Sequence, residues 1–400
     1  MSQRLRAANA LALFSALGLL LSSPAPAAGQ SKATVPTGVD TYNYVLGTQT
    51  IDGAYQFTTE NRLVETARAI QAMGSTTIKF SLGADEVTLP KNLIDAARNS
   101  PSVKAVFGMP FARYVLWAYP LSVAKTAWFQ QESLAAEYGE MYDLTRYLLQ
   151  TYSTTSKTFM LGNWEGDWHL THLDPNYGPS EEEVAAMIAW VNNRQRAVDD
   201  AKRDTPHHGV EVYLYLEVNR VVDAMQGKAR MTNRVLPRTN VDFVSYSSYD
   251  ALSGDIESNI TKSLDYIESQ LPAKPNVNGK RVFIGEYGFT TDRNSPEEQD
   301  AKSRSVMRAA LRWGCPHVLY WEFYNNEVRD GKQRGFWMVD DHNVKQPIFS
   351  THERFYRLAR QWVGEFEKRY DRLPLQAEFN RQAVSWLDPS AARPPAEARR

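Results

Sequence analysis

The sequence predicts an α/β fold, specifically a (β/α)8 TIM barrel, on three observations. Short runs rich in Val, Ile, Phe and Tyr alternate with longer amphipathic stretches. Eight such runs can be counted between residues 39 and 323. The sequence has neither a glycine-rich dinucleotide fingerprint nor a phosphate-binding loop. Alternation of strand and helix predicts parallel strands, and eight of them close into a barrel. A doubly wound open sheet is the main structural alternative.

The expected strands share two properties. Each is rich in β-branched or aromatic residues, and each is bounded by Gly, Pro or polar residues that favour turns. They cover Val39–Tyr44, Thr76–Leu82, Val103–Met109, Thr158–Asn163, Glu211–Val218, Val241–Tyr246, Arg281–Glu286 and Val318–Phe323.

The expected helices lie between these runs and show helical spacing of apolar residues. In the first of them, Leu63, Ala67 and Ile70 recur at this spacing, and Gly74 follows as a stop signal. Residues 180–183 form a capping box that opens another helix. Further expected helices cover 91–99, 130–151, 255–270, 296–313 and 349–369.

The N-terminal segment is typical of an export signal. Arg4 and Arg6 supply positive charge, residues 8–21 form an uncharged, mainly apolar run, and small residues at 25–27 suit cleavage. The apolar run is shorter than the ~20 residues that cross a bilayer. We therefore expect a cleaved signal peptide over 1–28, a secreted or periplasmic product, and no transmembrane segment after signal removal.

The remaining chain is expected to hold one catalytic barrel over residues 29–370. A chain of this length is compatible with a single barrel domain. From Asp371 onward the sequence is rich in Pro, Ala and Arg and has no hydrophobic period, which predicts a flexible C-terminal tail over 371–400.

The charge balance and the cysteine count argue against a nucleic-acid partner, an internal disulfide and a thiolate metal site. The 45 Lys and Arg residues nearly match the 46 Asp and Glu residues, and no basic block occurs, so nucleic acid is not an expected partner. Cys315 is the only cysteine, which excludes an internal disulfide and a thiolate metal site.

Two glutamates stand at the ends of expected strands, where a barrel of this type places its active site. Glu165 follows the fourth run, and Glu286 ends the seventh. Strands four and seven lie on opposing sides of the barrel mouth, so the two side chains can meet across it. Retaining glycoside hydrolysis needs two carboxyl groups about 5–5.5 Å apart, one as nucleophile and one as general acid and base. The placement therefore predicts this chemistry, with no cofactor.

A third carboxylate, Glu217, ends the fifth expected strand. Three roles fit this position: a sugar contact, an influence on the acidity of Glu165, and the role of acid/base itself.

The two glutamate motifs and the order of elements resemble clan A of the glycoside hydrolases, the retaining (β/α)8 families that include cellulases and mannanases. The resemblance covers most of residues 39–369 and implies that Glu165 is the acid/base and Glu286 the nucleophile. It also implies that Trp321 forms the floor of a sugar subsite and that Tyr246, or alternatively Tyr249, donates to the nucleophile.

The sequence departs from the clan A pattern directly before the acid/base. The clan usually has Asn there, whereas this chain has Trp164, with Asn163 one place earlier. Alternation along a strand would put Asn163 and Glu165 on one side, which keeps Asn163 a candidate for a sugar contact. Trp164, Trp168 and Tyr42 are further candidates, because aromatic rings stack on the apolar faces of sugars.

The sequence thus predicts a retaining hydrolase of a β-linked poly- or oligosaccharide. Two alternatives stay open. The first is a carbohydrate-binding barrel without catalysis. The second is a metal-dependent barrel hydrolase in which His169 and His172, in a His-x-x-His arrangement, bind zinc.

Overall fold

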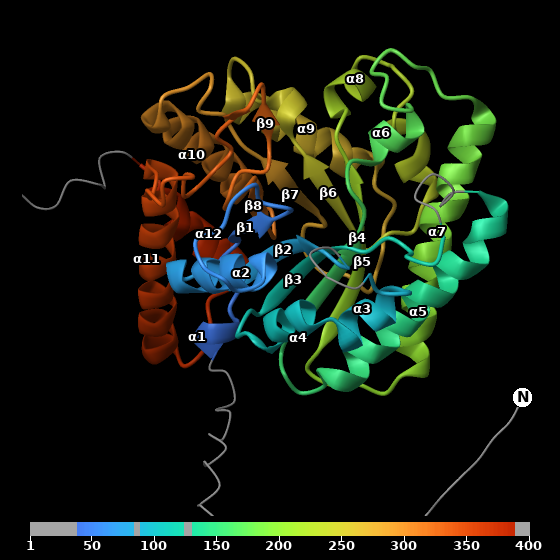
Figure 1. Ribbon diagram of the computed structural model, residues 1–400, viewed down its shortest axis with the longest axis horizontal. Coiled ribbons are helices and arrows are strands. Elements are labelled where there is room, and N and C mark those ends of the chain that lie inside the picture. The colour runs from blue at the N-terminus through green and yellow to red at the C-terminus, as the bar shows by residue number, and fades with distance from the viewer. Residues whose placement is uncertain (1–37, 84–88, 124–129, 389–400) are drawn as a thin grey trace, which may run out of the picture. The chain divides into compact units, whose positions relative to one another are not determined.

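The computed structural model describes residues 38–83, 89–123 and 130–388. The expected signal peptide, 1–28, lies outside these residues. The described chain forms a closed barrel in which strands β1 to β8 follow one another in sequence order (Figure 1). All neighbouring strands pair in parallel, and β8 pairs with β1 to close the ring. The predicted (β/α)8 fold is therefore confirmed.

The eight barrel strands are short, and nearly all of their residues are buried. Their bounds are β1 Leu46–Thr50, β2 Thr77–Ser81, β3 Arg113–Trp117, β4 Thr158–Gly162, β5 Glu211–Val218, β6 Phe243–Ser247, β7 Val282–Tyr287 and β8 Val318–Tyr320. A small hairpin, β9 Val328–Arg329 and β10 Lys332–Gln333, follows the barrel.

The longer helices surround the barrel and cover the outer faces of its strands (Figure 1). The capping box at Ser180 is present and starts the long helix α7. The α-helices are α1 Gly38–Thr41, α2 Arg62–Met73, α3 Leu93–Asn99, α4 Pro101–Gly108, α5 Leu134–Thr151, α6 Gly166–Leu170, α7 Glu181–Asp204, α8 Val221–Met225, α9 Ile256–Gln270, α10 Pro296–Trp313, α11 Pro347–Tyr370 and α12 Gln376–Ser385. None of these helices is long and apolar enough to cross a bilayer.

The first and third strands lie later in the chain than the sequence predicted. Residues 39–44 hold most of helix α1 and the connection that follows it, and β1 is Leu46–Thr50. The true strand is mostly polar in sequence, yet all five of its residues are buried. Residues 103–109 lie mainly in α4, which begins with Pro101 at its first position, and β3 is Arg113–Trp117. A continuous apolar run does not by itself distinguish a buried helix from a strand.

The centre of the barrel is filled by large side chains that point inward from its strands. Val115, Met160, Tyr215, Phe283 and Leu319 form this inner cluster. Gly162, at the end of β4, leaves room for the ring of Tyr215, which would lie 2.3 Å from an added Cβ atom. The barrel interior is therefore a packed core.

The predicted C-terminal tail begins too early. Residues 376–385 form helix α12, in which Phe379 is fully buried. The ring of Phe379 packs 5.3 Å from that of Tyr42, at the end of the barrel where the strands begin. Because α12 covers this end, the ordered domain extends well past Asp371.

Candidate active site

An open cavity of about 730 Å³ lies at the end of the barrel where the strands finish. Glu165 and Glu286 line it from opposite sides, as the sequence placed them. A larger cavity of about 940 Å³ lies at the opposite end, beside α10 and α12, but no Asp or Glu lines it. Of these two cavities, the smaller is therefore the one suited to carboxylate chemistry, and we call it the cleft.

Glu165 lies just after β4, in a turn that aims its side chain into the cleft. Its backbone has φ 24°, a conformation that residues other than glycine rarely adopt. Oε1 lies 2.5 Å from the Ser247 hydroxyl, and Oε2 accepts from Asn219 Nδ2 at 3.4 Å. Burial, with a smaller contribution from the nearby charge of Glu217, raises the pKa of Glu165 to about 7.

Glu286 is the penultimate residue of β7. Its Oε1 accepts from Lys79 Nζ at 2.9 Å, and Oε2 lies 3.4 Å from Ser247 Oγ. Burial raises the pKa of Glu286 well above its usual range, and the ammonium of Lys79 opposes this rise. A shift in the pairing of β6 and β7 sets Ser247 opposite Glu286, which brings the hydroxyl and the carboxyl together.

Ser247 limits the distance between the two glutamates, because its hydroxyl contacts both. The two contacts are 2.5 Å and 3.4 Å, so Glu165 Oε1 and Glu286 Oε2 lie no more than about 5.9 Å apart. The two carboxyl groups thus face each other across the cleft.

Lys79, on β2, is the most important site residue that the sequence interpretation missed. Its side chain is fully buried, and Nζ donates to Glu286, to Glu217 Oε2 at 3.0 Å and to the Gly285 carbonyl at 3.1 Å. Burial alone would lower the pKa of Lys79, but the two carboxylates outweigh this effect and raise it. The lysine is therefore a permanent cation beneath the cleft floor.

Gly285 allows this buried polar group to pack closely. A Cβ atom at position 285 would lie 1.7 Å from Ser245 Oγ and 2.9 Å from Glu217 Oε2. Only glycine lets the backbone of β7 approach Ser245 and Glu217 this closely.

Aromatic side chains form much of the cleft wall. Trp164, Trp168 and Trp321 all line the cavity, as expected for sugar contacts, together with Trp117 and Phe336. Trp321 follows β8 directly, and its ring lies 6.2 Å from that of Trp117. Asn219, Arg220, Asp250, Asn326, Glu327 and Arg334 add polar groups that the sequence did not single out.

Tyr246 does not contact Glu286, contrary to the expectation from the resemblance. Alternation along β6 turns Ser245 and Ser247 inward, so Tyr246 points outward and its hydroxyl donates to Asp250 Oδ1 at 2.5 Å. Tyr249, the alternative, lies in the turn after β6 and lines the cleft.

Asn163 and Glu217 are buried beneath the cleft and not exposed in it. Asn163 Oδ1 accepts from the Glu217 backbone amide at 3.2 Å, which joins the ends of β4 and β5. The Glu217 side chain is fully buried, so it has no surface to offer a sugar. The expected sugar contacts of both residues are therefore wrong, because each side chain is already engaged within the barrel.

Tyr42 lies at the opposite end of the barrel, next to Phe379. Its expected sugar contact is wrong because the first strand begins later than predicted, which puts Tyr42 ahead of β1 and not near the C-terminal end of the first strand.

The two histidines of the alternative metal site have separate partners. His169 Nε2 lies 3.2 Å from the Tyr119 hydroxyl, and burial lowers the pKa of His169 to about 4. His172 Nε2 lies 2.6 Å from Glu183 Oε1 and is half exposed. In the described part of the chain, neither belongs to a cluster of three side chains with the spacing of metal ligands.

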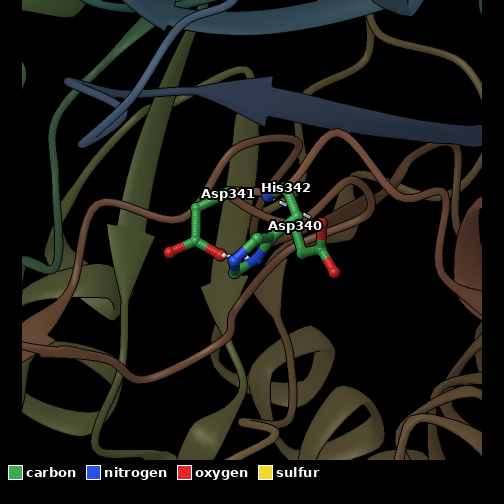
Figure 2. A group of neighbouring side chains, drawn as sticks. All are labelled: Asp340, Asp341 and His342. Atoms are coloured by element: carbon green, nitrogen blue, oxygen red, sulfur yellow. Dashed lines mark hydrogen bonds and ion pairs between the residues drawn. The ribbon is translucent and has the colours of Figure 1, made fainter.

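One group with such spacing does occur in the described ranges, at Asp340, Asp341 and His342 (Figure 2). It lies in the exposed loop before α11. Asp340 Oδ1 already accepts from the backbone amides of His342 and Val344, and its Oδ2 accepts from Gln346. These contacts account for Asp340 as a turn-stabilising residue.

No family model matches the chain, and no curated protein is similar to it in sequence. Solved structures are similar in fold. A GH5_18 from Bifidobacterium longum subsp. infantis has a TM-score of 0.55 and 12% identity, over 78% of each chain. A GH5_18 from Streptomyces cattleya in complex with Manb1-4GlcNAc has a TM-score of 0.54 and 9% identity, over 80% of this chain and 81% of that one.

A third solved structure, a GH5-4 broad specificity endoglucanase from Clostridium longisporum, has a TM-score of 0.50 and 12% identity, over 80% of this chain and 97% of that one. At these identities the likeness shows a shared barrel fold. The fold predicted from the resemblance to the clan A barrels is thus also that of solved glycoside hydrolases.

Proposed function

We propose that the protein is a retaining glycoside hydrolase that acts on a β-linked glycan through a covalent glycosyl-enzyme. The observation that carries this proposal is the pair Glu165 and Glu286, whose facing oxygens lie within about 5.9 Å. Retaining enzymes have a separation of about 5–5.5 Å, whereas inverting enzymes need about 6.5–9.5 Å to admit a water molecule.

The contacts of Lys79 assign different roles to the two glutamates. Its ammonium contacts Glu286 but not Glu165. Burial raises the pKa of both carboxyls, so burial does not separate their roles. Only Glu286 has a cation in direct contact, and this contact favours ionisation of Glu286 and leaves the proton on Glu165. A serine hydroxyl has a single proton. Protonated Glu165 can donate to Ser247 Oγ, which then donates to Glu286, so this assignment satisfies all three groups.

The reaction has two steps. In the first, a Glu286 oxygen bonds to the anomeric carbon while the glycosidic C–O bond breaks, and Glu165 gives its proton to the leaving oxygen. In the second, ionised Glu165 removes a proton from water, the water oxygen bonds to the anomeric carbon, and the bond to Glu286 breaks. The two displacements restore the starting configuration, and Glu165 regains its proton.

The substrate proposal draws on the cleft walls and on the structural neighbours. Tryptophans on several sides of the cleft suit stacking on sugar rings. The names of the neighbours mention an endoglucanase and a bound Manb1-4GlcNAc. We therefore propose β-linked glucans and mannose-containing glycans as the first substrates to examine.

The test is an activity screen on β-glucans, mannans, xylans, galactans and bacterial exopolysaccharides, with proton NMR of the first product. A β-anomer released before mutarotation is expected. Release of an α-anomer would exclude retention, and no hydrolysis of any glycan would exclude the proposed function. Export is a separate proposal, and mass spectrometry of the cell-derived protein would check it by a mature chain that starts near residue 29.

A further inference from the structure

Glu217 is fully buried on β5, yet its carboxyl reaches three other strands or turns of the site. Oε1 accepts from the backbone amide of Glu165 at 3.0 Å. Oε2 accepts from Lys79 at 3.0 Å and from the Ser245 hydroxyl at 2.7 Å. Glu217 therefore touches the backbone of one cleft glutamate and the cation that contacts the other.

The contact with Glu165 fixes an unfavourable backbone conformation. A residue with a side chain at φ 24° is strained by roughly 1–3 kcal/mol and persists only where its surroundings hold it. An ionised acceptor at 3.0 Å makes a stronger hydrogen bond to the amide than a neutral group would. The direction in which the Glu165 side chain enters the cleft thus depends on Glu217.

The contact with Lys79 divides one positive charge between two carboxylates. Glu217 forms one of the two ion pairs of the ammonium. Its negative charge raises the pKa of both Glu165 and Glu286. Tyr119 and Tyr215 interact electrostatically with Glu217, while Tyr249 and Glu322 interact with Glu286. Burial raises the pKa of these four groups, so the tyrosines stay neutral in the working pH range.

We propose that Glu217 is a positioning residue for both cleft glutamates, holding the Glu165 backbone through one oxygen and aiming Lys79 at Glu286 through the other. This inference rests on the proposed function for its kinetic consequences. It assigns Glu217 no contact with substrate, because its side chain is fully buried.

Two substitutions of Glu217 distinguish the effect of its hydrogen bond to the Glu165 amide from the effect of its charge. Glu217→Gln keeps an oxygen that can accept from the Glu165 amide but removes the negative charge. Glu217→Ala removes both. Glu137→Gln is the control, because Glu137 on α5 is also fully buried and paired with a cation, Arg194, but contacts neither cleft glutamate.

The experiment measures kcat and the pH profile of kcat/KM for the full chain. Glu217→Gln is expected to keep kcat within about 10-fold of wild type and to move both limbs of the profile to lower pH by about one pH unit. Glu217→Ala is expected to show the same shift and to lose about 100-fold in kcat. Glu137→Gln is expected to lower thermal stability and to leave both limbs in place.

A titration by NMR of glutamate carboxyl carbons, labelled with ¹³C, gives a readout that needs no substrate. In Glu217→Gln, the two cleft carboxyls should titrate at lower pH than in wild type. The inference would be overturned if, in Glu217→Gln, the limbs of the pH profile and the carboxyl titrations stayed at their wild-type pH. A wild-type kcat in Glu217→Ala would overturn it as well. If the wild-type protein hydrolyses no glycan, the proposed function fails, and the NMR titration still decides whether Glu217 controls the two carboxyls.

Discussion

The ammonium of Lys79, buried beneath the cleft, lies 2.9 Å from Oε1 of Glu286, which lines the cleft. This ion pair joins β2 to β7 on nearly opposite sides of the barrel. It places the cation that Glu217 and Glu286 share directly at the proposed nucleophile. The ionisation of Glu286 therefore depends on a residue that the substrate does not reach.

Replacing Lys79 with Met should raise the pKa of Glu286 further, because burial then acts without an opposing cation. The acid limb of kcat/KM should move to higher pH, and activity at pH 7 should fall by about 100-fold or more. Removing one partner of a buried ion pair should also cost about 3–5 kcal/mol of stability. Lys79→Arg keeps the charge and serves as the control. An unchanged acid limb in a folded Lys79→Met protein would contradict the assignment.

Replacing Glu286 with Ala removes the atom that attacks the anomeric carbon. Turnover should fall on the order of 10⁴-fold or more for every substrate, whatever its leaving group. Hydrolysis of the natural glycan and of an activated aryl glycoside should be measured side by side. Near-normal turnover of either substrate by Glu286→Ala would rule out this residue as nucleophile.

Replacing Glu165 with Ala removes proton donation, which matters most for poor leaving groups. Hydrolysis of the natural glycan should fall by about 10²–10⁴-fold. Formation of the glycosyl-enzyme from an activated aryl glycoside should fall much less, and azide should accelerate the variant by attacking that intermediate. Equal losses on both substrates, without azide rescue, would assign the proton-transfer role elsewhere.

The raised pKa of Glu165 also predicts how stability depends on pH. Its pKa is about 7 in the folded protein, against an ordinary value of 4.5 for an exposed glutamate, so the folded state binds the proton more tightly. This tighter proton binding stabilises the folded protein fully below pH 4.5, and the stabilisation is lost as the pH rises through 7. Glu165→Gln should therefore stabilise the protein on the order of 3 kcal/mol at pH 8 and little at pH 4. Urea unfolding at both pH values measures this, and equal effects would contradict the shift.

Chelation tests the alternative metal site. Because His169 and His172 have separate partners, prolonged treatment with EDTA should leave both activity and Tm unchanged. His172→Ala, whose side chain is half exposed, should change the stability by less than about 1 kcal/mol. Loss of activity on chelation, restored by zinc, would revive the metal-dependent mechanism.

The sequence predicted the barrel because alternation of strands and helices is a property of long segments. It misplaced β1, since Thr48, Gln49 and Thr50 are polar in sequence but buried in the barrel. It also missed α12, whose apolar residues are few: Phe379 and Ala383 are buried among polar neighbours. Local composition does not reveal burial that depends on distant partners.

The site was predictable to the extent that strand ends determine it. Glu165, Glu286, Trp164, Trp168 and Trp321 do line the cleft. Beneath them, the sequence singled out Glu217 and gave an influence on Glu165 as one of its three roles, but it did not predict Lys79, whose contacts join residues up to 207 positions apart. One signal was available. Lys79 is a charged residue within an otherwise uncharged strand, and a buried lysine requires an anionic partner.

The pairing of Lys79 with two glutamates has a consequence for the evolution of this barrel. Exchange of Glu286 for a neutral residue leaves Lys79 neutralised by Glu217 alone, a balanced pair in place of an excess of buried negative charge. We expect such a variant to lose catalysis and to gain stability, because less negative charge is buried. The exchange removes none of the four tryptophans that line the cleft. If the proposed function holds, one stabilising exchange at position 286 is expected to turn the enzyme into a sugar-binding protein, whereas exchange of Lys79 first is expected to destabilise the barrel.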